Sequence, residues 1–216
     1  MRPLEGRVAL VTAAGDGVGR RVALALGRAG ARVGIAARTD GDVTRLAGEL
    51  RAAGASAHTV VGDVSVPADV RSIVDEISLR LGPIDLLVNC SEINGEGRPR
   101  AGDREAWWRI IALNVRGPML CCHAVLPGMI AAGRGHVFNV TGAIGHPAVP
   151  LDSAYGASNA ALFRLTESLG AALQGTGVAI FDVSPAEHIG EIIVRLAAGR
   201  SGNLAGRTVH ADPVLR

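Results

Sequence analysis

Tyr155, the only tyrosine of the sequence, is a side chain that could transfer a proton. A phenol with a pKa of about 10 is a proton donor at neutral pH and a poor base. His146 and Asp152 precede it by nine and three residues. An imidazole close to Tyr155 would serve as a base, although a loop histidine is more often a surface residue. This combination predicts acid–base chemistry.

A second chemical pattern is the glycine-rich turn that begins at Thr12. The turn reads Thr12-Ala13-Ala14-Gly15-Asp16-Gly17-Val18-Gly19 and follows the apolar run Val8-Ala9-Leu10-Val11. Glycines at such a turn let the backbone approach a pyrophosphate at the N-terminus of the next helix. The turn therefore predicts a nucleotide site, although other strand-to-helix turns also use glycine.

The elements that must position these groups alternate between strand and helix. Short apolar runs predict strands at 8–12, 31–37, 58–61, 84–89, 136–140, 178–183 and 208–210. Helices are predicted from the glycine-rich turn to about residue 30 and at 41–53, 70–81, 103–132, 153–174 and 187–198. Pro118 and Pro127 are expected to bend or break the helix at 103–132. The alternation predicts one α/β domain over residues 1–216, a Rossmann-type doubly wound parallel sheet with helices on both faces.

Composition limits the classes of partner. The 216 residues are 48% hydrophobic, and the net charge of +2 comes without a dense basic run, so neither nucleic acid nor anionic lipid is an expected partner. No apolar stretch reaches the length of a membrane span, and no signal peptide or metal-ligand spacing is visible. Three cysteines, two of them adjacent, argue against a disulfide framework. We expect a cytoplasmic protein without a metal.

The motifs together resemble those of the short-chain dehydrogenase/reductase family. That family carries a Ser, a Tyr thirteen residues later and a Lys four residues after the Tyr. Tyr155 matches the Tyr, but Gly142 stands at the Ser position and Asn159 at the Lys position. The resemblance implies a divergent member that lacks two of its three central catalytic groups.

The resemblance extends to the cofactor site. Ala13 replaces the first glycine of the family's T-G-x-x-x-G-x-G pattern, and Glu92 replaces a glycine that lets the backbone lie against the cofactor. Ala37 stands where an acid usually binds the ribose, and Arg38 follows, which implies NADP(H) rather than NAD(H). Because Glu92 would obstruct the site, loss of nucleotide binding is the alternative. The implied cofactor-binding residues are Thr12, Gly15, Gly17, Val18, Gly19, Arg38, Asp63, Val64, Asn89 and Asn159.

The remaining catalytic positions also follow from the resemblance. Asn114, seven residues after Trp107, matches the Asn that kinks a helix and holds a proton-relay water. Asn159 can bind a ribose hydroxyl but carries no charge, so Tyr155 should be a proton donor and a poor base. After Pro185 the chain lacks the few dozen residues that form the family's substrate lid.

Three functions remain open on the sequence. One is a non-redox enzyme that uses Tyr155, with Asn114, His146 or Asp152, to cyclise, dehydrate or isomerise a carbonyl-containing small molecule. The second is an NADP(H)-dependent carbonyl reductase or alcohol dehydrogenase with an altered site. The third is a catalytically silent subunit. By resemblance we expect a homo-oligomer, or a hetero-oligomer with another family member, assembled through the helices at 103–132 and 153–174.

Overall fold

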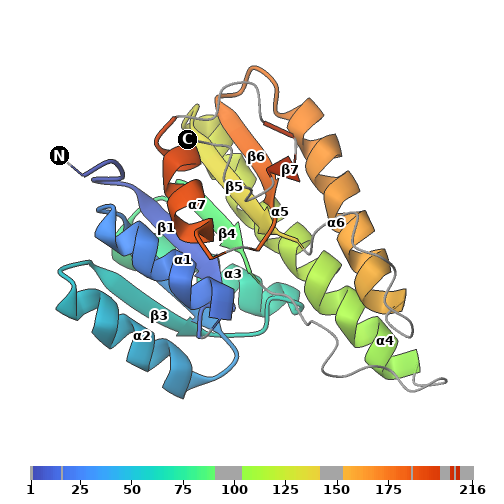
Figure 1. Cartoon of the computed structure of the whole chain (residues 1–216), viewed down its shortest axis with the longest axis horizontal. Coiled ribbons are helices and arrows are strands. Elements are labelled where there is room, and N and C mark those ends of the chain that lie inside the picture. The colour runs from blue at the N-terminus through green and yellow to red at the C-terminus, as the bar shows by residue number, and fades with distance from the viewer. Residues whose placement is uncertain are drawn as a thin grey trace.

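Seven parallel strands form one sheet in the order β3-β2-β1-β4-β5-β6-β7 (Figure 1). The computed structural model describes residues 2–15, 17–90, 104–141, 153–185, 187–199, 205–206 and 208–209. The strands are β1 (Val8–Thr12), β2 (Arg32–Ala37), β3 (Ala57–Val61), β4 (Leu86–Asn89), β5 (Gly135–Val140), β6 (Val178–Val183) and β7 (Thr208–Val209). The chain order reverses between β1 and β4, which creates the crevice where open α/β sheets bind ligands.

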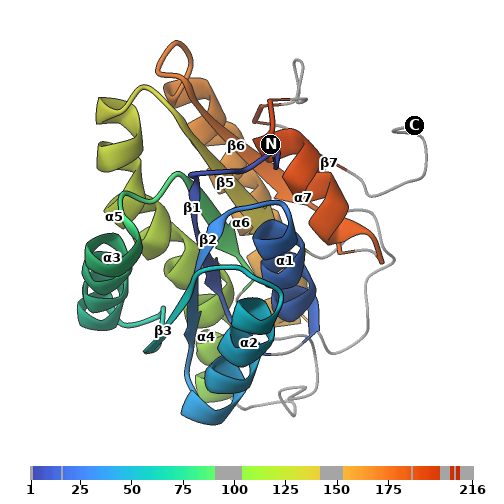
Figure 2. The same cartoon turned by 90° about the vertical axis from the view of Figure 1, so that its left-hand side faces the viewer.

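Helices cover both faces of the sheet, as the sequence predicts (Figure 2). One face carries α1 (Gly17–Arg28), α2 (Asp40–Ala52) and α7 (Ile189–Ala197). The other carries α3 (Pro67–Leu81), the π-helical segment η1 (Ala112–Arg116), α5 (Gly117–Ala131) and α6 (Ser153–Ala172), while α4 (Arg104–Ile111) precedes η1 and packs against α6. Because both faces are covered, β1 and β4 are buried along their whole length, which explains why their sequences are nearly all apolar.

The expected break at Pro118 or Pro127 does not occur. The chain is helical from Arg104 to Ala131, and its irregularity is the π turn of η1, which ends just before Pro118. A wider π turn accommodates a ring that cannot donate a backbone hydrogen bond, and Pro118 then lies in the first turn of α5. Pro127 lies within α5 without ending it.

The stretch Arg104–Ala131 corrects a second expectation. Its 28 residues, with a mean hydropathy of 1.4 in the most apolar window, are long and apolar enough to cross a membrane. Half of that window is buried within the protein, where η1 and α5 contribute Leu113, Cys121, Val125 and Met129 to the core. This burial is typical of a core helix.

The connection between β6 and α7 is short. Strand β6 ends at Val183 and α7 begins at Ile189, so five residues, 184–188, join them. Despite the shortened segment that the sequence predicts after Pro185, β6 remains paired in the sheet and α7 remains packed in the helical layer.

All three cysteines are buried free thiols. Burial raises the pKa of Cys122 to about 12 and raises that of Cys121 as well. Because the thiolate is the reactive form, Cys121 and Cys122 are packing residues rather than nucleophiles.

Candidate active site

The carboxyl ends of the strands gather most of the predicted site residues at one edge of the sheet. Thr12 ends β1, Asn89 ends β4, and Arg38 and Asp63 follow β2 and β3. Tyr155 lies in the first turn of α6, the helix that follows β5. Since parallel strands all end at the same edge, five segments far apart in sequence meet there.

The glycine-rich turn between β1 and α1 contains two residues with positive φ angles. Gly17 has φ +47°, and Ala13, in place of the family's first glycine, has φ +48°. Both are exposed. A Cβ on Gly19 would lie 2.5 Å from the carbonyl oxygen of Ala13, so only glycine lets α1 begin this close to the turn. Ala13 thus has a left-handed conformation that glycine adopts more readily.

Thr12 fastens this turn to the centre of the sheet. Its hydroxyl accepts a hydrogen bond from the backbone N–H of Cys90 at 3.1 Å and lies 3.5 Å from the carbonyl oxygen of Val88. Nearby, the Arg45 guanidinium donates to the Gly15 carbonyl oxygen at 3.5 Å, and Val18 packs against the core. The β1 and β4 ends are thus held together next to the turn.

Arg38 and Asp63 occupy the next two strand ends. Arg38 is exposed directly after β2. The Asp63 carboxylate accepts hydrogen bonds from the backbone N–H of Ser65 at 2.8 Å and from its hydroxyl at 2.7 Å. The turn after β3 is therefore built around this carboxylate, while the next residue, Val64, is buried in the core.

A row of buried polar side chains crosses the sheet beneath this edge, and of its members only Asn89 was predicted as a site residue. Asn89, Asn139 and Asp182 are register partners on β4, β5 and β6. Asn89 Nδ2 donates to Asn139 Oδ1 at 2.8 Å, Asn139 Nδ2 donates to Thr166 Oγ1 at 2.9 Å, and Thr166 Oγ1 donates to Asp182 Oδ1 at 2.8 Å. The row ties three strands to α6. Its signal in the sequence is a polar residue near the end of each strand.

Asp182 is the unusual member of this row. It is fully buried, its Oδ1 atom accepts the hydrogen bond from Thr166, and its Oδ2 atom has no partner among the described residues. Burial raises the pKa of Asp182 to about 7, and the hydrogen bond from Thr166 opposes this rise. Burial therefore keeps this carboxyl group protonated to a higher pH than an exposed aspartate.

Asn114 lies at the centre of η1 and reaches the turn that carries Tyr155. Its Nδ2 donates to Ser158 Oγ at 3.1 Å, and the Ser158 hydroxyl donates to the backbone carbonyl of Tyr155 at 2.8 Å. Asn114 and Ser158 are both buried, whereas Tyr155 is half-buried. The structure thus brings together two predicted residues through a serine that the sequence analysis did not single out.

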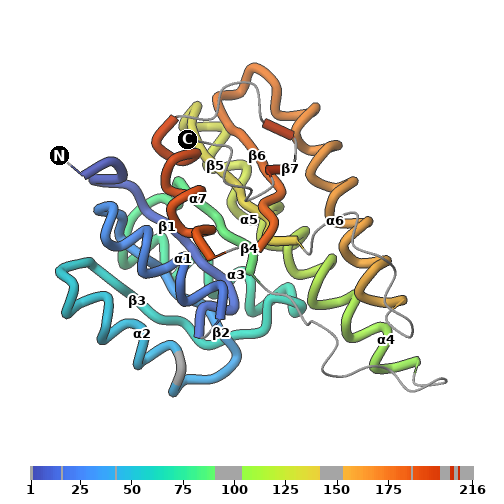
Figure 3. The backbone as a smooth tube through the Cα atoms, in the orientation of Figure 1, coloured from blue at the N-terminus to red at the C-terminus, as the bar shows by residue number. Residues whose placement is uncertain are grey.

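Asn159 lies one turn after Tyr155. Its Nδ2 donates to the Tyr155 carbonyl oxygen at 3.2 Å. Ser153, at the start of α6, is exposed, and its hydroxyl accepts a hydrogen bond from the indole N–H of Trp107 on α4 at 3.1 Å. The helices α4 and α6 lie side by side (Figure 3).

Two hydroxyls at the ends of β5 and β6 have no partner within the part of the chain that the structure describes. Thr141 Oγ1 and Ser184 Oγ are buried there without a hydrogen bond. Both residues follow a valine that packs against the α1 and α7 side, namely Val140 and Val183, so alternation places them on the α6 side of the sheet.

Several predicted site residues lie outside the part of the chain that the structure describes. His146 and Asp152, offered as assisting groups, lie outside the described residues, as do Gly142 and Glu92. Within the described part of the chain, no cluster of three or more His, Cys, Asp or Glu side chains could hold a metal ion. The site as described thus consists of the β1–α1 turn, the strand ends and the Tyr155 turn.

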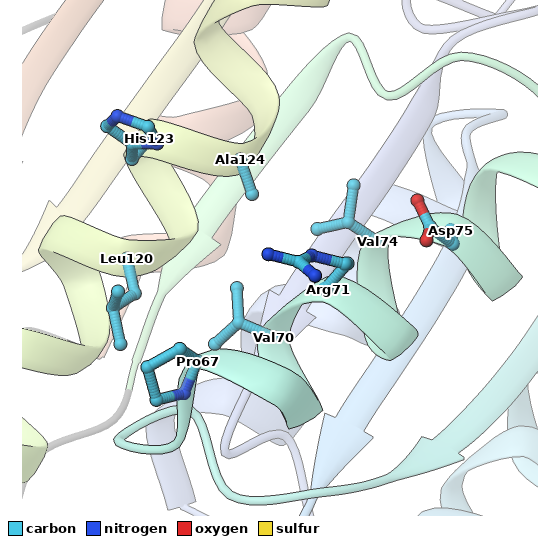
Figure 4. A pocket seen from close by; sticks show the side chains of 8 residues that line it. All are labelled: Pro67, Val70, Arg71, Val74, Asp75, Leu120, His123 and Ala124. Atoms are coloured by element: carbon cyan, nitrogen blue, oxygen red, sulfur yellow. The ribbon is translucent and has the colours of Figure 1, made fainter.

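A cavity of about 390 Å³ lies elsewhere, between α3 and α5 (Figure 4). It is lined by Pro67, Val70, Arg71, Val74, Asp75, Leu120, His123 and Ala124. None of these belongs to the predicted site residues.

Comparison with known families decides the ancestry of this site. The family model described as short chain dehydrogenase matches residues 7–191. The chain belongs to this family. Most of the site described above, from the β1–α1 turn to Tyr155, lies within the matched range.

Individual short-chain dehydrogenases agree with the family match. A short chain dehydrogenase from Pseudocercospora fijiensis is 37% identical over 184 residues, which are 84% of this chain and 60% of that relative. The chain therefore spans about three fifths of that relative's length. A 2-(S)-hydroxypropyl-CoM dehydrogenase from Xanthobacter autotrophicus is 33% identical over 84% of this chain and 71% of its own.

A solved short-chain dehydrogenase structure extends the likeness to the whole fold. The crystal structure of a metagenomic short-chain oxidoreductase in complex with NADP is 30% identical and has a TM-score of 0.89. The alignment covers 97% of this chain and 99% of that one. The Rossmann-type sheet expected from the sequence is thereby confirmed.

Proposed function

We propose that the protein is an NADP(H)-dependent oxidoreductase that reduces a carbonyl group of a small molecule, with Tyr155 as the proton donor. The observation that carries the proposal is the β1–α1 turn. Ala13 keeps a positive φ without being glycine, and Gly19 leaves room for the turn against α1. A non-glycine residue in this conformation costs about 1–2 kcal/mol, so its retention fits a backbone shaped for a phosphate.

The same edge carries groups that would contact other parts of a dinucleotide. The exposed backbone at Ala13 and Gly17 would face the pyrophosphate, next to the N-terminus of α1. Thr141 and Ser184, whose hydroxyls have no partner among the described residues, would offer hydrogen bonds deeper at the edge. Dinucleotide binding by a relative whose structure contains NADP supports this assignment.

Arg38 favours NADP(H) over NAD(H). Its guanidinium follows β2 in an exposed position, where a ribose 2′-phosphate would lie, and the preceding Ala37 offers no carboxylate to repel it. A guanidinium pairs with a phosphate in a two-pronged geometry, which a neutral ribose hydroxyl does not exploit.

Tyr155 and its surroundings favour the reducing direction. Bound NADPH would supply the hydride, and reduction would then require one proton on the carbonyl oxygen. The neutral Tyr155 phenol can donate that proton and is regenerated from solvent, whereas alcohol oxidation needs a base to accept one. Asn159 provides no positive charge to produce the phenolate. The hydrogen bonds through Asn114 and Ser158 hold the Tyr155 turn in place.

Cofactor-free acid–base chemistry at Tyr155 is the alternative that the sequence analysis placed beside reduction. It uses the same tyrosine and Asn114, and it also invokes His146 and Asp152. For cofactor-free chemistry the described residues provide a proton donor. For the reductase they provide both a proton donor and the β1–α1 turn, where a nucleotide phosphate would bind.

Assembly into oligomers belongs to the proposal as well. Trp108 is 60% exposed, Met119 39% and Ile130 44%, all on the continuous helix from α4 to α5. Apolar side chains of this size on one helix favour burial against another subunit, either a second copy or a related chain. A silent subunit would share this surface but would not bind nucleotide productively.

Calorimetric titration with NADPH, and with NADH for comparison, tests the proposed function. We expect micromolar binding of NADPH and weaker binding of NADH. The Arg38→Ala substitution should weaken NADPH binding about tenfold and leave NADH binding unchanged, because only NADPH carries the 2′-phosphate. If neither nucleotide binds, the reductase proposal is excluded, which leaves cofactor-free chemistry or a silent subunit.

A further inference from the structure

The first turn of α6 is fastened to the α4–η1 helix at its beginning. The indole Nε1 of Trp107 lies 3.1 Å from Ser153 Oγ. An indole N–H can only donate, so the Ser153 hydroxyl is the acceptor. Ser153 is the first residue of α6 and lies two residues before Tyr155.

A second connection lies three residues after Tyr155. Asn114 Nδ2 donates to Ser158 Oγ at 3.1 Å, and this hydroxyl donates back to the Tyr155 carbonyl oxygen at 2.8 Å. Tyr155 is therefore bracketed by two side-chain hydrogen bonds that come from the same neighbouring helix. The second belongs to the buried core, whereas the first is exposed.

The first turn of a helix needs such a connection more than later turns do. Its backbone N–H groups have no partners within the helix, and helix ends fray for this reason. In α6 this turn carries Tyr155, so fraying would displace the phenol from the site. Trp107 is itself held by the edge-to-face contact with Trp108, whose ring centroid lies 4.9 Å away at an interplanar angle of 82°.

We infer that Trp107 is a positioning residue for Tyr155: its hydrogen bond to Ser153 holds the first turn of α6 in the conformation that presents the phenol. Trp107 acts on the chemistry through Tyr155 and does not need to touch the substrate. The inference rests on the proposed function in one respect, namely that Tyr155 is the proton donor.

The composition of the chain allows a direct test, since Tyr155 is its only tyrosine. Nitration by tetranitromethane, followed by mass spectrometry of the peptide that contains Tyr155, reports the accessibility of this phenol alone. Trp107→Phe should raise the nitration rate about 2- to 10-fold, the factor that corresponds to the net contribution of one hydrogen bond. Ser153→Ala should raise it equally, and the double variant should add nothing further, because both changes remove the same bond.

Two controls separate positioning from a general structural role. Trp108→Phe changes the adjacent tryptophan of the same helix, keeps an aromatic ring beside Trp107 and should leave the nitration rate at the wild-type value. Ser153→Thr keeps a hydroxyl acceptor and should also leave the nitration rate at the wild-type value. A melting temperature that falls while nitration stays constant in Trp107→Phe would overturn the inference, as would equal acceleration in Trp108→Phe.

The test is independent of cofactor binding. Nitration requires neither NADPH nor a carbonyl substrate, so a protein that binds no nucleotide still reports whether Trp107 positions Tyr155. Conversely, an unchanged nitration rate in a protein that binds NADPH would reject the role of Trp107 and leave the proposed function standing.

Discussion

A Cβ atom on Gly19 would lie 2.5 Å from the carbonyl oxygen of Ala13. This distance is shorter than any ordinary contact between a carbon and a backbone oxygen, so the turn between β1 and α1 depends on a glycine at position 19. The same turn holds Ala13 at φ +48°, a conformation that glycine adopts more easily.

Gly19→Ala should therefore damage the turn. The new Cβ would meet the Ala13 oxygen, the Ala14 Cα at 2.8 Å and the Ala13 carbonyl carbon at 3.1 Å, and none of these backbone atoms belongs to a flexible side chain. We expect the free energy of unfolding to fall by about 1–3 kcal/mol and NADPH binding to be lost, as measured by urea denaturation and calorimetry. Gly48→Ala in α2, where a Cβ would meet nothing within 4 Å, is the matched control and should be neutral or stabilising. Equal behaviour of the two variants would contradict the close approach.

Ala13→Gly should have the opposite effect on stability. Removing the Cβ relieves the left-handed strain, and the entropy of a new glycine in the unfolded chain offsets part of the gain, so we expect a net increase of up to about 1 kcal/mol. Ala14→Gly is the control, because Ala14 has no positive φ and its replacement should destabilise. Urea denaturation of both variants measures the difference. A loss of stability in Ala13→Gly would show that the turn carries no strain at this residue.

Asp182 should make stability depend on pH. Its folded-state pKa of about 7 lies above the ordinary value of 3.8, so the folded protein binds more protons than the unfolded chain between these values. The contribution of Asp182 to the free energy of unfolding is fully present below about pH 4. It is lost as the pH rises to about 7, and above that pH no further change is expected. The loss amounts to at most about 4 kcal/mol.

Comparison with the Asp182→Asn variant isolates this contribution. The amide cannot ionise, yet its oxygen can still accept from Thr166. His136, whose pKa burial lowers to about 4, acts in the opposite sense, since its contribution rises with pH up to about 6.5. It is present in both proteins and cancels in their difference. Urea denaturation between pH 4 and 8 should show the variant gaining stability relative to wild type as the pH rises, and a constant difference would contradict the raised pKa.

Tyr155→Phe should abolish turnover under both enzymatic readings. Loss of a general acid typically costs 10²- to 10⁴-fold in rate, while the half-buried ring is retained, so the melting temperature should not fall. Activity assays with NADPH and a panel of carbonyl compounds, alongside thermal denaturation, check both parts. Retained activity would remove Tyr155 from the mechanism.

Asn159→Lys tests whether the absence of a charge at position 159 makes Tyr155 a proton donor rather than a base. An ammonium one helical turn from the phenol should lower the pKa of Tyr155, which its ultraviolet absorption reports without interference because no other tyrosine exists. Combined with Gly142→Ser, it should also raise carbonyl reduction, by more than the sum of the single effects. Asn159→Gln, which adds length but no charge, should leave the titration unchanged.

Much of this architecture was predictable from the sequence because its signals are local. Apolar runs of five or six residues mark strands buried on both faces, and the glycines after Thr12 mark a strand-to-helix turn. These patterns, with the Tyr155 motif, sufficed for the alternating fold and the family. The expected break at Pro118 was wrong because the effect of a proline depends on the turn before it. Here that turn is a π turn within a continuous helix.

Tertiary structure decided the rest. Asn89, Asn139 and Asp182 lie some 40 to 50 residues apart in sequence and meet only through the register of parallel strands. The elevated pKa of Asp182 follows from its burial beneath α6, and the sequence shows only an acidic residue within an apolar run. Likewise, no local pattern links Trp107 to Ser153 or Asn114 to Ser158, since these bonds depend on how α4 and η1 pack against α6. Propensity and periodicity act over a few neighbouring residues, whereas hydrogen bonds and desolvation act between groups that only the folded chain brings together.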